Sequence, residues 1–144
     1  MVVNIGKVLG EDWDYVEQEI AAIVGVTKKY KAALKVIFEN DYLPTDHYKI
    51  KLCEICSKLH VEFVKTSTGY GFIKGADGKY SYEGATEHDL ILMRKHSAPE
   101  VQIKAAGGVR TYDDVVNFLK LGVKRIGTSA AKTIADGQVS ESEY

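Results

Sequence analysis

The chain has 144 residues, of which 45% are hydrophobic and 27% charged, and its formal net charge is −1, from 19 Lys and Arg against 20 Asp and Glu. Such a chain is typical of one globular domain, because at this length roughly two thirds of the unfolded surface can be buried in a single core. The near-neutral charge argues against nucleic-acid binding by phosphate neutralisation, and no apolar run approaches the ~20 residues that a membrane span needs.

Short β-branched runs alternate with longer stretches of helical spacing five times along the chain. The runs are almost continuously apolar, as in strands that are covered on both faces. The predicted strands are residues 1–5, 34–39, 62–66, 101–105 and 125–128. Because strand–helix–strand alternation forms right-handed βαβ units, the sequence predicts an α/β fold with a parallel sheet.

The stretches between the predicted strands carry helix signals. Apolar residues recur at a period close to 3.6 in the first two stretches, at Trp13, Val16, Ile20 and Ile23 and at Tyr48, Leu52, Ile55 and Leu59. Thr86 and Thr111 each precede an Asp by three residues, the spacing of a capping box, and so predict two further helix starts. Gly122 is expected to end the fourth helix, and a fifth is predicted over residues 129–136.

One glycine-rich and aromatic segment, residues 69–84, interrupts this rhythm and is interpreted as a long loop between a strand and its helix. Asp77-Gly78 within it predicts a small hairpin. We expect residues 1–137 to form one domain and residues 138–144 to form a flexible carboxyl-terminal tail.

Cys53 and Cys56 form a C-x-x-C pair, a spacing found in redox and zinc sites. The pair lies inside a stretch of helical spacing, and no second Cys or Cys/His pair supplies two further ligands. The sequence therefore predicts two buried thiols on a helix and no metal site. The histidines share no ligand spacing and are expected at the surface; they are His47, His60, His88 and His96.

Three of the five predicted strands carry a lysine among apolar residues: Lys35, Lys65 and Lys104. Lysine is almost never fully buried without a partner, so the three side chains are expected to share a polar interior. Burial and like charge both disfavour an ammonium group, and a free amine attacks carbonyl carbons. Any one of these lysines alone is better explained as a residue at a strand end whose side chain reaches solvent. Three lysines on one sheet favour a functional site.

Glycine-rich turns follow the last two predicted strands, at residues 105–110 and 127–129. Each leads into a helix start, and glycine lets backbone N–H groups approach a ligand, so both turns suit a phosphate group. Ser129 can add a hydroxyl. A tight connection between strand and helix is the alternative interpretation of either turn alone.

Three motifs in this order resemble deoxyribose-phosphate aldolase: residues 64–69 (VKTSTG), 103–111 (IKAAGGVRT) and 125–129 (RIGTS). The resemblance extends over nearly the whole chain, to the terminal Tyr144. It implies a partial (β/α)8 TIM barrel of five βα units, similar to strands 4 to 8. It also implies a class I aldolase without a cofactor, which interconverts 2-deoxy-D-ribose 5-phosphate with glyceraldehyde 3-phosphate and acetaldehyde.

Carried over by position, the resemblance implies that Lys65 is the Schiff-base lysine, that Lys104 keeps its amine deprotonated, and that Lys35 supports them. Thr68 resembles a residue that contacts a substrate hydroxyl. The positions that match the family's phosphate loops are Gly69, Gly107, Gly108, Gly127 and Ser129.

The sequence departs from the family in a few places. Ala130 stands where relatives have a second serine, and the loop at 69–84 is longer than in short members. The family's proton-relay aspartate falls immediately before the position of Met1, so impaired turnover is expected, with Glu39 as an alternative carboxylate.

An incomplete barrel exposes strand edges and apolar surface, so self-association or a homo-oligomer is expected. A non-catalytic phosphosugar-binding or interaction module is the alternative function, and an independent doubly wound phosphate-binding domain is a third. The expected partners are phosphorylated deoxysugars and small aldehydes, with no nucleic acid and no membrane. The amino terminus resembles neither a signal nor a transit peptide, so a cytoplasmic location is expected.

Overall fold

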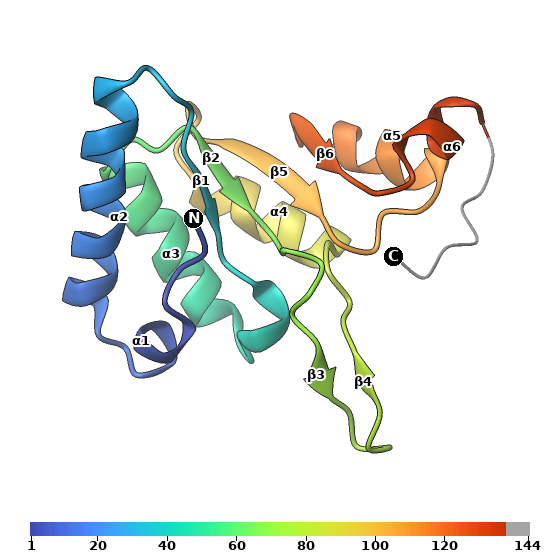
Figure 1. Cartoon of the computed structure of the whole chain (residues 1–144), viewed down its shortest axis with the longest axis horizontal. Helices are drawn as coiled ribbons and strands as arrows, with labels where there is room; N and C mark the ends of the chain where they lie inside the picture. Colours follow the sequence, from blue (N-terminus) through green and yellow to red (C-terminus); the bar gives the residue numbers. More distant parts are fainter. Residues whose placement is uncertain (138–144) are drawn as a thin grey trace.

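A parallel sheet of four short strands, in the order β1-β2-β5-β6, organises the chain (Figure 1). The computed structural model describes residues 1–137. The strands are β1 (Lys35–Ile37), β2 (Phe63–Lys65), β5 (Gln102–Ala106) and β6 (Arg125–Gly127). All three neighbouring pairs are parallel, which confirms the predicted α/β class. The predicted tail, residues 138–144, lies outside the described residues.

The first predicted strand, residues 1–5, is wrong as a full strand. Only Val2 forms a bridge, parallel to Ile37, supported by a hydrogen bond from the N–H of Ile37 to the carbonyl of Met1 at 2.9 Å. The chain leaves the sheet because the side chain of Asn4 accepts from the N–H of Lys7 at 3.1 Å and so starts helix α1 (Ile5–Leu9). The apolar pattern of the segment concealed this helix cap.

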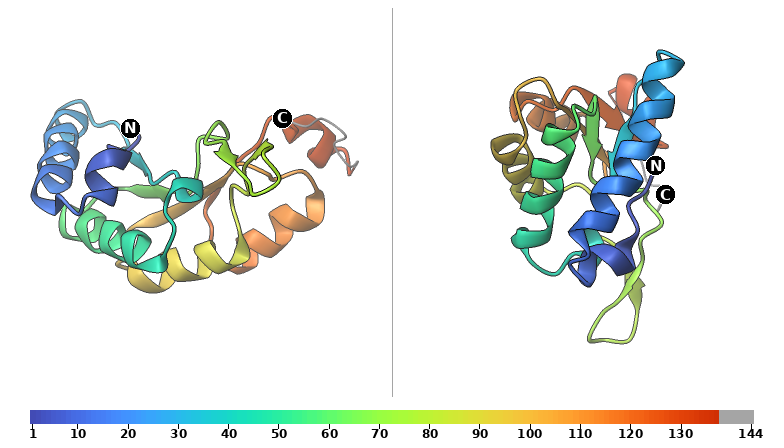
Figure 2. Two further views of the ribbon diagram at one scale, coloured as in Figure 1. Left: turned by 90° about the horizontal axis from the view of Figure 1, so that it is seen from below. Right: turned by 90° about the vertical axis from the view of Figure 1, so that its left-hand side faces the viewer.

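Helices follow one another in an arc along one face of the sheet, as the left view of Figure 2 shows. They are α2 (Trp13–Lys29), α3 (Asp46–Lys58), α4 (Glu87–His96) and α5 (Tyr112–Lys120), followed by the short α6 (Ala131–Ala135). A single turn, η1 (Asn40–Tyr42), joins β1 to α3. None of the helices within residues 1–137 has the length and hydropathy needed to cross a bilayer.

The core lies between the sheet and these helices. Alternate strand residues point to it, and Val36, Val64 and Ile103, which are paired in register, are all fully buried. Leu52 and Leu90 close the core from α3 and α4 and are equally buried. Since the period of a strand is two, the intervening residues lie on the opposite, inner face of the sheet.

The predicted helix ends are mostly confirmed. Thr111 and Asp114 form a complete capping box at α5, and Gly122, at φ +94°, follows its last turn. At α4, Thr86 accepts from the N–H of Asp89 at 3.1 Å, but the Asp89 carboxylate binds Lys49 instead of completing a box. The fifth helix is shorter than predicted, because α6 begins only at Ala131.

The loop over residues 69–84 contains the predicted hairpin. Strands β3 (Ile73–Lys74) and β4 (Tyr80–Ser81) are antiparallel, and Gly78 has the positive φ of +80° that the turn requires. In Figure 1 the hairpin projects away from the four-stranded sheet. The loop is therefore ordered by its own pairing at the tip.

Adjacent residues of α4 offer a test of this packing. Leu90→Ala is expected to lower the free energy of unfolding by about 2–5 kcal/mol, because it leaves a cavity in a fully buried position. Ile91→Ala, at a position that is 51% exposed, is the matched control and should cost roughly 0.5 kcal/mol or less. Urea unfolding of both variants measures the difference, and equal losses would contradict the described core.

Candidate active site

The inner face of the sheet carries a row of basic side chains. Lys65 of β2 pairs directly with Lys104 of β5, which in turn pairs with Arg125 of β6. Lys35 lies on the same face, because it is two residues before Ile37, the register partner of Lys65 on β1. The predicted common face of the three lysines is thus confirmed. Arg125 was missed, although it lies two residues before a predicted phosphate glycine and so shares its face.

A phenylalanine contacts two of these cations. The ring of Phe63 lies under the Nζ atom of Lys35 at 5.5 Å and under the guanidinium carbon of Arg125 at 4.6 Å. Phe63 is only 5% exposed, although it belongs to the inner face. Both cations make cation–π contacts with the ring, so Lys35 is held beside Phe63.

A pocket of about 250 Å³ lies at the carboxyl ends of β2, β5 and β6. Seven predicted site residues line it: Lys65, Thr68, Gly69, Gly107, Gly108, Gly127 and Ser129. Lys35 and Lys104 are not among its lining residues. Four further lining residues belong to the two turns predicted to suit a phosphate group: Ala106, Val109, Arg110 and Thr128. The sequence interpretation missed Tyr70 and Tyr82, which come from the two ends of the loop over residues 69–84.

The environment of Lys65 favours a free amine. Partial burial lowers the pKa of Lys65, and the positive charges of Lys104 and Lys35 lower it further, against an opposing effect of Glu39. Lys65 thus lines the pocket and has a lowered pKa. These are the two properties that a carbonyl-attacking lysine needs.

Gly127 provides space for Lys104. A Cβ atom at position 127 would lie 2.9 Å from Cε and 3.4 Å from Nζ of Lys104, and 3.0 Å from the Cβ of Ala106. Lys104 therefore extends across the bare backbone of β6. The sequence interpretation assigned Gly127 to phosphate binding alone, and the packing adds this second requirement for glycine.

The Gly107-Gly108 turn is pressed against the loop that precedes α4. A Cβ on Gly84 would lie 2.5 Å from the carbonyl carbon of Gly107, and Gly84, Gly107 and Gly108 all have positive φ. The N–H of Ala85 donates to the carbonyl of Gly107 at 3.1 Å. Side chains are excluded here by backbone contact.

The backbone directly before α5 is bonded to the helix itself. The Oδ2 atom of Asp114 accepts from the N–H groups of Arg110 at 3.2 Å and Thr111 at 2.9 Å. The Oγ1 atom of Thr111 accepts from the N–H of Asp114 at 3.0 Å. The turn itself, rather than the helix terminus, forms the pocket wall. A contribution of the helix terminus to phosphate binding stays a prediction.

Glu39, the alternative carboxylate, is buried at the end of β1 and binds Thr68. Its Oε1 atom accepts from the N–H of Thr68 at 3.0 Å and its Oε2 atom from the Thr68 hydroxyl at 2.5 Å. Asp41, in η1, similarly holds the loop through the N–H of Gly84 at 3.2 Å. The segments that lead into and out of the loop are thus held by two carboxylates that follow β1, those of Glu39 and Asp41.

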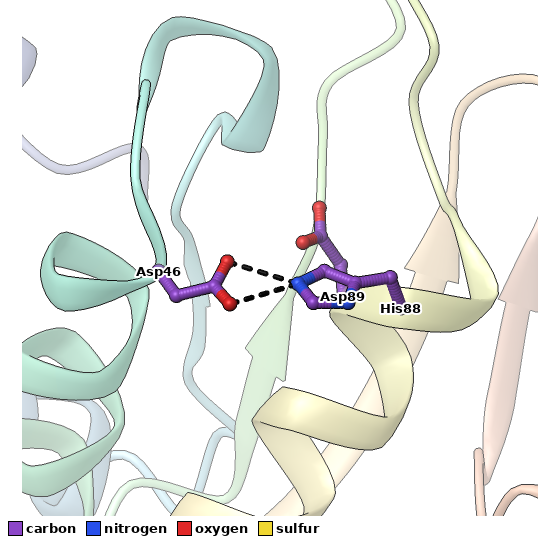
Figure 3. Close-up of side chains that lie close together, drawn as sticks. All are labelled: Asp46, His88 and Asp89. Carbon is purple, nitrogen blue, oxygen red and sulfur yellow. Dashed lines mark hydrogen bonds and ion pairs between the residues drawn. The ribbon is translucent and has the colours of Figure 1, made fainter.

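Among the described residues, Asp46, His88 and Asp89 place their ligand atoms within 4.8 Å of one another (Figure 3). The Nε2 atom of His88 lies 2.9 Å from Asp46, while Lys49 donates to Asp89 at 2.5 Å and Asn40 donates to its other oxygen at 2.8 Å. An ammonium group already neutralises the buried carboxylate. The cluster is an ion-pair network that joins α3 to α4.

The predicted buried thiols are confirmed. Cys53 and Cys56 are free and fully buried in α3. Burial raises the pKa of Cys53 to about 12 and raises the pKa of Cys56 well above its usual value. The side chains of His47, His60 and His88 are exposed, as predicted, while His96 is half-buried at the end of α4.

These features define a class: a segment of an α/β barrel, with helices on the outer face and paired lysines on the inner face at the carboxyl ends of its strands. No protein-family model matches the chain. It is 49% identical over 128 residues to deoxyribose-phosphate aldolase of Rhodopirellula baltica, covering 89% of this chain and 48% of that protein. It is 44% identical over 144 residues to that of Clostridium perfringens strain 13, covering 100% and 59%.

Solved structures agree. A structure from Coccidioides immitis, assigned to deoxyribose-phosphate aldolase, matches with a TM-score of 0.80 at 32% identity, over 94% of this chain and 50% of that one. The tetrameric deoxyribose-phosphate aldolase of Aeropyrum pernix matches with a TM-score of 0.72 at 28% identity, over 86% and 49%. The chain is homologous to deoxyribose-phosphate aldolase and spans about half the length of the relatives it matches.

The lowered pKa of Lys65 gives a pH prediction. An amine reacts above its pKa, so acetic anhydride should modify Lys65 with a midpoint at lower pH than an exposed lysine. Lys104→Met removes one positive charge and should move the Lys65 midpoint to higher pH, while burial keeps part of the shift. Lys95→Met, on exposed α4 surface, is the control. Peptide mass spectrometry across a pH series measures both, and an unmoved midpoint in Lys104→Met would contradict the coupling.

Proposed function

We propose that Lys65 forms a Schiff base with an aldehyde and that the pocket serves the reversible cleavage of 2-deoxy-D-ribose 5-phosphate to glyceraldehyde 3-phosphate and acetaldehyde. The observation that carries the proposal is the position of Lys65, which lines the pocket directly beside Lys104 with its pKa lowered. Homology to deoxyribose-phosphate aldolase supports the same chemistry.

The proposed reaction begins when the free amine of Lys65 attacks the aldehyde carbon, and loss of water gives an iminium ion. The iminium draws in the electron pair of the bond between the second and third sugar carbons, and the hydroxyl on the third carbon gives its proton to a solvent water as glyceraldehyde 3-phosphate leaves. The enamine left on Lys65 is then protonated and hydrolysed to acetaldehyde. Lys104, next to Lys65 in register, keeps the attacking amine deprotonated.

The glycine turns supply the proposed phosphate site. Gly69, Gly107, Gly108, Gly127 and Ser129 line the pocket with Lys65. Arg110 adds a positive charge at the same pocket, which compensates for Ala130 at the position of the family's second serine. Residues 1–137 act in this proposal as one partial-barrel domain. The cytoplasmic location stays a prediction from the sequence.

Trapping tests the nucleophile. Incubation with acetaldehyde and borohydride should leave an ethyl group on Lys65, because reduction fixes the imine as a stable secondary amine. Lys65→Met should abolish this adduct, and Lys95→Met, at an exposed position, should not. Peptide mass spectrometry locates the adduct. A folded chain that carries no adduct at Lys65 would refute the Schiff-base proposal.

A self-associating, non-catalytic phosphosugar-binding segment is the second candidate. A groove of about 480 Å³ lies between the amino terminus and α2, lined by Met1, Val2, Tyr15, Gln18, Glu19, Ala22 and Ile23. Val2, Tyr15 and Ile23 expose 37–42% of their surface, so the groove presents apolar area to solvent. Calorimetric binding of 2-deoxyribose 5-phosphate without any lysine adduct would favour this candidate.

Self-association is expected at this groove. Sizing at two protein concentrations should show a larger species at the higher one, since burying apolar surface drives association. Ile23→Glu should shift the equilibrium toward monomer, while Ile91→Glu, on the exposed face of α4, should leave it unchanged. A monomer at both concentrations would contradict the prediction.

A further inference from the structure

Glu39 is buried and has an unfavourable backbone conformation. It is 5% exposed and has a φ of +56°, a left-handed conformation that glycine adopts readily and glutamate rarely. It is also a potential charge removed from water. Such a backbone conformation persists only where several contacts from the surrounding structure hold it. Strained conformations of this kind occur most often at functional sites.

Two features of the loop fix the Glu39 carboxylate. Thr68 donates to it twice, from its N–H to Oε1 and from its hydroxyl to Oε2. Gly71 leaves room for it, since a Cβ at that position would lie 2.8 Å from Oε1 and 2.9 Å from Cδ of Glu39. The carboxylate is therefore clamped between the end of β2 and the loop.

The bonds of the Thr68 hydroxyl decide what it can offer a ligand. A hydroxyl has one proton and two acceptor positions. The proton goes to Glu39, and one acceptor position takes the N–H of Tyr70 at 3.0 Å. One acceptor position is left on a residue that lines the pocket together with Lys65. In this arrangement Thr68 can accept a hydrogen bond from a ligand and cannot donate one.

We infer that Glu39 is a positioning residue that makes Thr68 an obligate hydrogen-bond acceptor, so that the pocket selects aldehydes carrying a hydroxyl group over aldehydes without one. The inference rests on the proposed function in one respect, that an aldehyde binds beside Lys65. It goes beyond that function by assigning a role to Glu39 and a direction to the hydrogen bond at Thr68. A buried acceptor left unpaired penalises the ligand that lacks a donor.

Glu39→Gln reverses the polarity of the clamp. The glutamine amide offers one oxygen and one NH2 group to the two donors of Thr68, so the Thr68 proton is released toward the pocket. We expect the half-saturating concentration of 2-deoxyribose 5-phosphate for borohydride trapping at Lys65 to rise on the order of tenfold relative to that of acetaldehyde. Comparing the two aldehydes in one variant cancels the effect that the Glu39 charge has on the Lys65 amine.

Gly71→Ala tests the same clamp without touching its hydrogen-bonding groups. The added Cβ displaces the Glu39 carboxylate, so this variant should show the same loss of selectivity as Glu39→Gln. Gly25→Ala, in α2, is the matched control, because a Cβ there meets nothing within 4 Å. Equal losses for both aldehydes in Glu39→Gln and Gly71→Ala would indicate a purely structural role and overturn the inference.

A second readout separates this inference from the Schiff-base proposal. Lys65→Ala cannot form an imine, so calorimetry in that background measures only non-covalent binding of 2-deoxyribose 5-phosphate. Adding Glu39→Gln should weaken the binding on the order of tenfold, and adding Gly25→Ala should not. Absent or unchanged binding overturns the role of Glu39. Absence of any acetaldehyde adduct in the unchanged chain overturns the Schiff-base proposal alone.

Discussion

The pairing of β2 with β5 places two lysines side by side, and the rest of the site depends on it. Lys65 and Lys104 are neighbours in register, and the positive charge of Lys104 disfavours the charged form of Lys65. Helices cover the opposite face, where Val64 and Ile103 occupy the neighbouring register position and are fully buried. A shift of one residue in this pairing would turn one of the two lysines into the core.

Some residues around the lysine pair leave room for a neighbouring side chain, and others fix the position of the strands. Gly127 leaves room for Lys104, and Gly71 leaves room for Glu39. Thr66 fixes the strands, because its hydroxyl donates to the carbonyl of Ala106 at 2.9 Å and accepts from the same residue's N–H at 3.1 Å. The positions of Lys104 and Glu39 and the alignment of β2 with β5 therefore depend on small residues that carry no charge.

Much of the fold and site could be predicted from the sequence, because period-two and period-3.6 patterns locate strands and helices, and the lysines break the apolar strand pattern. The prediction of an amino-terminal strand over residues 1–5 was wrong, because the apolar run concealed the helix cap at Asn4. Contacts between distant segments could not be predicted, for they depend on register and loop path. Arg125 meets Phe63, and Glu39 meets Thr68, only through the packing of neighbouring strand ends.

The backbone contact between Gly84 and Gly107 divides the long loop into two parts with different freedom. Its returning end is fixed against the Gly107-Gly108 turn, while the hairpin tip, closed by the N–H of Gly75 bonding to the carbonyl of Lys79 at 2.8 Å, depends on local bonds. Insertions or deletions at the tip are therefore absorbed before they reach the pocket. The hairpin is a segment in which length can vary during evolution, or be altered by design, independently of the pocket beside Lys65.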